Sequence, residues 1–211
     1  MKKYVVLFML IFMGYQLSSF AQAVDDRAVV PLSVTLNSIL RLNIESGGNI
    51  EFNFNTLNQY QNGINTSYDN DLYQTRLTVA SSVNYDLEMG AEDSRLVSTD
   101  TVSTGGGMPL GYITYQVALD DGSSFSAGSG NQLTLANSGA PTILTQITDG
   151  TDLVSNSNGN AGDVTDNAFT INWACGDGTT GITDAEGSLM GSDLTGGRYS
   201  TNVFFILRPA D

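Results

Sequence analysis

Carboxylates are the most plentiful side chains in this sequence that could do chemistry. The chain has 22 Asp and Glu residues and no histidine, which excludes Ser-His-Asp and Cys-His catalysis and histidine-ligated zinc. A pair of carboxylates can hydrolyse a glycosidic bond. Here, however, several acidic residues stand beside glycine in turn-like segments, where Asp serves the backbone. We therefore predict that the protein is not an enzyme.

Four loops carry the oxygen ligands that calcium prefers, at 69–71, 149–152, 156–160 and 163–167. None has the twelve-residue spacing of an EF-hand, so ordinary turn chemistry is the alternative interpretation. Calcium is the one cofactor that the residues suggest. Its candidate ligands are Asp149, Asp152, Asp163 and Asp166.

The aromatic residues divide into core and surface candidates. Trp173 alternates with Phe169 and Ile171, and this spacing predicts a place in the core. Three tyrosines lie instead in a polar stretch rich in Asn and Gln, where an exposed ring could contact a glycan or a protein. These candidates are Tyr60, Tyr68 and Tyr73.

Cys175 is the only cysteine, so no disulfide can form within the chain. It ends an apolar alternating run, which favours a buried, apolar side chain. The other interpretation is a crosslink between two subunits.

The first 23 residues have the three parts of a secretory signal peptide. Lys2 and Lys3 are followed by an apolar run at 4–13, and Ala21 and Ala23 form the small-residue cleavage pattern. The apolar run is shorter than the roughly 20 residues that a membrane helix needs. We therefore predict cleavage after Ala23, export through the periplasm, and a secreted or cell-surface location without membrane insertion.

The exported part is strongly acidic. It retains 188 of the 211 residues and no lysine, with six arginines against 22 acidic residues, a formal charge of −16. Nucleic-acid binding depends on clustered cations that release counterions from phosphate. This composition therefore argues against a nucleic-acid partner, and no Schiff-base chemistry is open to a chain without lysine.

Alternation with a period of two dominates the remaining sequence and predicts strands. We expect strands at 30–36, 40–45, 50–54, 113–119 and 169–175, with weaker ones near 132–135 and 143–147. The runs on either side of the glycines at 47–48 predict a hairpin. A longer run at 77–89 predicts one strand that bends at Ser81 and Ser82.

No segment shows a clear helical period, and long polar loops join the strands. About nine short strands in 188 residues fit an all-β fold, an antiparallel β-sandwich of the Greek-key type. We expect residues 24–211 to form a single such domain.

The first and last strands of this domain could also assemble the protein. A strand at a chain end can add to a neighbour's sheet edge through backbone hydrogen bonds and side-chain pockets. The final strand is apolar on both faces, as expected for a strand inside a sheet or one that awaits a partner. The candidate assembly residues are Val30, Leu32, Val34, Leu36, Val203, Phe205 and Leu207.

The segment 196–207, which reads GGRYSTNVFFIL, resembles the final strand of spore coat protein U and related secreted, pilin-like β-sandwich families. Those families end in small residues, Gly-x-Tyr and an alternating strand. The resemblance implies a fibre, coat or adhesion role and carries no catalytic residues.

The sequence thus predicts an exported bacterial structural or adhesive subunit that polymerises by sharing an edge strand. It would associate with itself or with other surface proteins. The alternative is a monomeric β-sandwich module that binds a glycan or calcium.

Overall fold

A computed structural model describes residues 30–66, 71–100, 106–119, 133–135, 141–149, 151–156, 159–177 and 186–210. The predicted signal peptide and Tyr68 lie outside these ranges. The chain divides into two units, residues 1–36 and residues 37–211.

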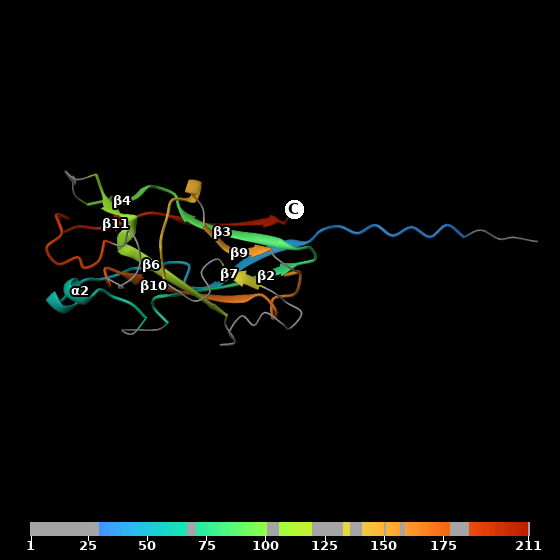
Figure 1. The fold of residues 1–211 in the computed structure, drawn as a ribbon, viewed down its shortest axis with the longest axis horizontal. Coiled ribbons are helices and arrows are strands. Elements are labelled where there is room, and N and C mark those ends of the chain that lie inside the picture. The colour runs from blue at the N-terminus through green and yellow to red at the C-terminus, as the bar shows by residue number, and fades with distance from the viewer. Residues whose placement is uncertain are drawn as a thin grey trace, which may run out of the picture. The chain divides into compact units, whose positions relative to one another are not determined.

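Residues 37–211 form antiparallel sheets that pack against each other, which confirms the predicted β-sandwich (Figure 1). One sheet has five strands, in the order β1 (Leu40–Ser46), β2 (Gln74–Ser81), β10 (Ala168–Cys175), β6 (Ile113–Leu119) and β8 (Thr142–Ile143). The other has four, in the order β12 (Val203–Pro209), β3 (Tyr85–Ala91), β9 (Thr151–Asn156) and β7 (Leu133–Leu135). A smaller group joins β11 (Tyr199–Ser200), β4 (Arg95–Ser98) and β5 (Met108–Pro109).

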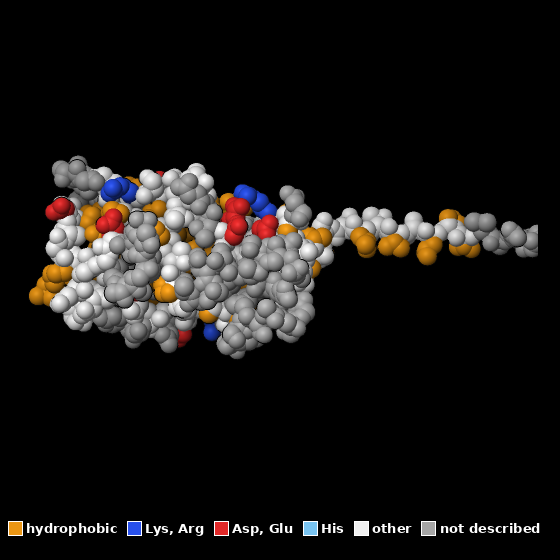
Figure 2. Space-filling view, in the orientation of Figure 1, with side chains coloured by type: hydrophobic (Ala, Val, Ile, Leu, Met, Phe, Trp, Pro, Cys, Tyr) orange, Lys and Arg blue, Asp and Glu red, His pale blue; other side chains and the backbone are white. Residues whose placement is uncertain are grey.

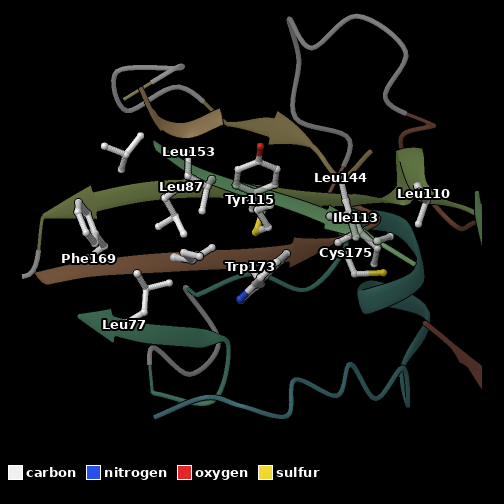
Figure 3. Close-up of a cluster of buried hydrophobic side chains, with 14 of the residues drawn as sticks. Leu77, Leu87, Leu110, Ile113, Tyr115, Leu144, Leu153, Phe169, Trp173 and Cys175 are labelled. Atoms are coloured by element: carbon white, nitrogen blue, oxygen red, sulfur yellow. The ribbon is translucent and has the colours of Figure 1, made fainter. Parts of the chain in front are cut away.

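The core lies between the two larger sheets (Figure 3). Several strands contribute one parity of their side chains, whereas β9 contributes both Leu153 and Val154. In β10 the inward residues are Phe169, Ile171, Trp173 and Cys175, as the alternation predicts. Leu77 of β2 and Leu87 of β3 enter the same cluster from opposite sheets. The predicted core position of Trp173 is confirmed, since only 5% of the residue is exposed.

The predicted long strand at 77–89 is instead two strands in different sheets. β2 ends at Ser81, and β3 begins at Tyr85 in the facing sheet. The Ser81 hydroxyl holds the corner between them, because it donates to the C=O of Val83 and accepts from the Val83 N–H. The odd-numbered apolar residues face the core on both sides of the corner, in β2 and in β3.

The predicted hairpin between 40–45 and 50–54 is wrong. β1 pairs with β2 rather than with the next segment, and residues 50–54 form no strand. Gly47 turns the chain closely against β2, with a φ of 69° and with its C=O accepting the Thr75 hydroxyl. Phe52 then stacks on Tyr73 at 5.0 Å between ring centroids, so this segment packs onto the core without joining a ladder.

A short helix, α2 (Leu57–Asn62), is missing from the sequence-based predictions. Thr56 and Gln59 form a capping box, in which the Thr56 side chain accepts from the Gln59 N–H and the Gln59 side chain accepts from the Thr56 N–H. The spacing Thr-x-x-Gln is a recognised signal of a helix start. It could have located this helix, although six residues are too few for a hydrophobic period. Two 3₁₀ turns, η2 (Leu110–Tyr112) and η3 (Ile147–Asp149), complete the elements within the described ranges.

Candidate functional site

Residues 30–36 form no strand, contrary to the expectation for this segment. The backbone is irregular, and all four alternating apolar residues are exposed. The exposed fractions are 84% for Val30, 90% for Leu32, 75% for Val34 and 89% for Leu36. A strand needs a partner for its backbone groups and a surface for its apolar face. This segment therefore has the pattern of a strand without either requirement met.

β12 lies at the edge of its sheet, and not in the sheet interior that one interpretation of its composition suggested. Val203, Phe205 and Leu207 are half-buried and pack against the core. On the opposite face Phe204 is 44% exposed and Ile206 is half-buried. An edge strand that is apolar on both faces is the kind that proteins usually protect from further pairing.

Backbone hydrogen bonds just beyond the two ends of β12 show which way its peptide groups point. The Glu92 N–H donates to the C=O of Asn202, and the Ala210 N–H donates to the C=O of Asn84, both at 2.8 Å. Directly opposed antiparallel residues alternate between hydrogen-bonded and non-bonded pairs. The register of β12 on β3 is unbroken, so the even-numbered residues of β12 bond to β3.

The odd-numbered residues of β12 therefore direct their backbone groups toward the free edge, where Pro209 provides a C=O but no N–H. In the part of the chain that the structure describes, no second strand pairs with this edge. The same residues, Val203, Phe205 and Leu207, turn their side chains toward the core. A strand added here would place side chains directly opposite them on the core face, where partly exposed apolar surface remains.

β1 is the other long edge strand, and it contacts β12 across the two layers. The Ser82 N–H donates to the C=O of Ile39, so the odd-numbered residues of β1 bond to β2. Leu40 and Leu42 are half-buried core neighbours whose backbone groups point to the free edge. The sandwich thus has two apolar edges that meet along one side.

Charged side chains do not cover the apolar surface along this edge. Arg208, on the outward face of β12, donates to Glu88 of the adjacent strand at 2.7 Å. On the face seen in Figure 2 the few Arg side chains of the described residues are scattered and form no patch. Exposed ion pairs of this kind contribute about 0–1 kcal/mol, so the free edge owes its character to apolar side chains and open backbone groups.

The calcium candidates do not form a common site among the residues that are described. Asp163 accepts from the N–H and the hydroxyl of Thr165, at 2.8 and 2.6 Å, and these bonds lower the pKa of its carboxyl. Asp166 accepts from the Asp163 N–H at 3.4 Å. Asp152 is exposed on β9, and the side chain of Asp149 lies outside the described part. Within the described ranges, no three Asp, Glu or Cys side chains converge to hold a metal ion.

The expected exposed aromatics differ from one another. Tyr73 is only 7% exposed and stacks on Phe52, so its prediction as a surface ring is wrong. Tyr60, in α2, is 38% exposed and packs against Phe54 at 5.3 Å between centroids, which confirms its exposure. The structure therefore leaves one described tyrosine of the three at the surface.

Cys175 is buried at the end of β10 with 2% of its surface exposed, which confirms the apolar interpretation and contradicts the crosslink. Burial, followed by the charge of Asp177, raises the pKa of its thiol to about 12. We expect the native protein to resist alkylation by iodoacetamide at pH 8 and to react on unfolding in urea, because the thiolate is the nucleophile. Mass spectrometry of labelled samples measures both rates.

The raised pKa of the Cys175 thiol also predicts how the stability of the fold changes with pH. The raised pKa favours the neutral thiol in the folded state, so its contribution is complete below about pH 9 and is lost as the pH rises toward about 12. Equal labelling rates for native and unfolded protein at pH 8 would contradict this account of Cys175.

A buried amide network escaped the sequence-based predictions. The Asn160 side chain accepts from the Tyr85 N–H at 2.8 Å and donates to the Tyr85 C=O at 2.6 Å, which imitates a neighbouring strand. The Tyr85 hydroxyl donates to Asn167 at 2.9 Å, and the Asn167 C=O accepts from the Val79 N–H of β2. This network joins the two sheets near the corner, but no sequence pattern distinguishes these asparagines from those of ordinary turns.

We expect Asn160→Ala to lower the free energy of unfolding by about 2–4 kcal/mol, because two backbone groups of Tyr85 would lose their partner in a buried site. Urea denaturation measures the change. The exposed Asn53→Ala should change stability by less than about 0.5 kcal/mol. If the two variants unfold alike, the network does not stabilise the corner.

No described helix is long and apolar enough to cross a bilayer. Comparison with family models and with curated proteins gives no match for this chain. Two separate features are therefore the candidates for assembly, residues 30–36 in one unit and the free edge of the sandwich in the other.

Proposed function

We propose that this chain is an exported structural subunit that assembles into a fibre or coat. In this proposal residues 30–36 of one copy add as a strand to the exposed sheet edge of another copy. The predicted signal peptide supports export, and the resemblance of 196–207 to secreted coat and pilin-like families supports the structural role.

The observation that carries the proposal is the exposure of the alternating residues in 30–36. Four large apolar side chains at 75–90% exposure, each separated from the next by one residue, fit the pleated surface of a strand. The sandwich offers a matching edge, with core-facing apolar residues and open backbone groups on β12. The docking segment and the sheet edge that would receive it thus occur in one sequence, as a self-assembling chain requires.

Magnitudes show what decides whether such docking is stable. Burying four Val or Leu side chains contributes roughly 6–12 kcal/mol. Ordering seven residues costs roughly 7–14 kcal/mol. Because these terms nearly cancel, the backbone hydrogen bonds, at about 1 kcal/mol each, determine the balance.

The proposal is tested on the chain that the predicted cleavage leaves, residues 24–211. Light scattering over rising concentration, with electron microscopy of the same samples, should show linear assemblies that lengthen with concentration. A protein that stays monomeric at every concentration would overturn the proposal.

A further inference from the structure

We propose that Pro31 determines the orientation of the docked strand, antiparallel rather than parallel to its partner. Residues 30–36 of one copy join β12 of a second copy in the antiparallel orientation, with the missing N–H of Pro31 on the side away from β12. This inference rests on the proposed function and adds to it the acceptor strand, the register and the role of one residue.

β12 is a better acceptor than β1, the other long edge. The ladder of β1 is irregular between Ile44 and Ser46, and bulges of this kind protect an edge from pairing. Arg41 and Glu45 add exposed charges to its outward face. β12 keeps one register over all seven residues, from Val203 to Pro209, and has the same length as segment 30–36.

The antiparallel orientation covers the apolar face and satisfies the backbone except opposite Val30, where Pro209 has no N–H to donate. The residues of β12 that offer backbone groups to the free edge also face the core. In an antiparallel pair, directly opposed hydrogen-bonded residues share a face. The apolar residues of 30–36 then bond to β12 and cover the core together. Over the full length the core-facing pairs are Leu32 with Leu207, Val34 with Phe205, and Leu36 with Val203.

Pro31 fits this arrangement because of its position in the alternation. It belongs to the parity of Ser33 and Thr35, whose backbone groups face away from β12 in the antiparallel ladder. The N–H that proline lacks is therefore not needed for docking.

The parallel orientation fails the same test. In a parallel pair, the residue that directs its groups at the partner lies opposite one that directs its groups away. If Leu32 and Val34 faced the core in that orientation, the residues bonding to β12 would be Pro31, Ser33 and Thr35. Pro209 leaves one acceptor of the docked segment without a donor in either orientation, and in the parallel one Pro31 would leave a further acceptor of β12 unpaired. This additional loss favours the antiparallel ladder.

Pro31 also limits what can follow. Once docked, segment 30–36 becomes the new outer strand, and its open edge lacks one N–H at Pro31. Proline on an edge strand discourages a further strand from pairing. The contact should therefore extend the assembly from copy to copy without widening the sheet.

Folding of the segment back onto its own β1 meets an obstacle at Ile39. The Ile39 N–H donates to the Ser82 hydroxyl, and its C=O accepts from the Ser82 N–H. With Ile39 held in the ladder, a tight turn at 37–38 would pair Leu36 with Ile39. This shift by one residue would turn the apolar side chains to the outer face.

A pair of proline substitutions, made in the chain of residues 24–211, tests whether the docked strand is antiparallel to β12. Ser33→Pro should leave the concentration for half-assembly within about threefold, because the Ser33 N–H faces away from β12. Val34→Pro should raise that concentration by more than about thirtyfold, because a ladder N–H is lost, and Val34→Ala controls for the changed side chain. The opposite order of the two proline variants would overturn the antiparallel ladder.

A disulfide between copies tests the register. In the proposed ladder Thr35 lies directly opposite Phe204, at a separation that a disulfide can span. In the parallel alternative Thr35 lies opposite Arg208. We expect T35C/F204C to form a ladder of crosslinked multimers on a non-reducing gel and T35C/R208C to form few, while the buried Cys175 stays reduced.

The outcomes separate this inference from the proposed function. Crosslinking by T35C/R208C alone, a crosslink within one chain, or assembly without either crosslink would overturn the inference and leave the rest of the account to its own test. Failure of the unmodified chain to assemble would overturn the proposed function, and this inference with it.

Discussion

Replacing Leu32 and Val34 with aspartate should abolish assembly of residues 24–211 and leave the sandwich folded. Docking would force two carboxylates against the apolar surface beside Phe205 and Leu207, and would lose the burial of two apolar side chains. Lost burial alone amounts to roughly 3–6 kcal/mol, and burial of unpaired charge costs more. We expect the concentration for half-assembly to rise more than about 1,000-fold, measured by light scattering.

The matched control places the same two charges on the other parity, as Ser33→Asp with Thr35→Asp. These side chains face outward in the proposed ladder, so assembly should weaken by less than about tenfold. Both variants should keep the thermal midpoint of the monomer, because 30–36 contributes no strand to the described sandwich. Equal effects of the two double variants would show that charge alone, and not the face of a strand, controls assembly.

Trp173→Ala should produce the largest loss of monomer stability. Trp173 is 5% exposed, lies 5.9 Å from Tyr115 between ring centroids, and donates from Nε1 to the Thr75 hydroxyl at 2.9 Å. Removing a buried aromatic ring costs about 3–5 kcal/mol. That is a large part of the roughly 5–15 kcal/mol that stabilises a typical domain. Urea denaturation followed by circular dichroism measures the change.

Tyr60→Ala is the control for this variant, because Tyr60 is exposed on α2 and the loss of its ring should cost about 1 kcal/mol or less. The predicted order follows from the difference in burial, so it also tests whether the Trp173 face of β10 packs into the core between the two sheets. A Trp173→Ala protein as stable as the control would contradict that placement.

The alternation of apolar residues predicted the inward faces of the strands well. In β6 and β10 the residues that alternate in the sequence are those that face the core, and in β2 and β3 the parity continues past Ser81. A period of two follows directly from the pleat of a strand. It holds whichever strand turns out to be the neighbour.

The pairing of strands could not be predicted in the same way. The glycines at 47–48 favoured a local hairpin, yet β1 pairs with β2, which begins 28 residues after Ser46 ends the first strand. Residues 50–54 alternate as regularly as the true strands. Phe52 stacks on Tyr73, however, and the segment pairs with no strand. Alternation records which face is apolar and carries no information on the partner. The same limit explains the wrong surface prediction for Tyr73.

The sequence predicted the apolar residues of the candidate site but not the direction of its free backbone groups. The apolar residues of 30–36 and of β12 stand out by alternation, and these were predicted as assembly residues. The role of Pro31 depends instead on the direction of the free backbone groups of β12, and two hydrogen bonds at the ends of that strand define it. Such information exists only in the register of the folded sheet.

Sedimentation velocity of residues 24–211 beside residues 37–211, at equal concentrations, tests the central claim most directly. The account predicts a broad distribution of large species for the longer chain and a single folded monomer for the shorter one, since only the longer chain has the docking segment. Two monomers, or large species of equal size from both chains, would contradict it.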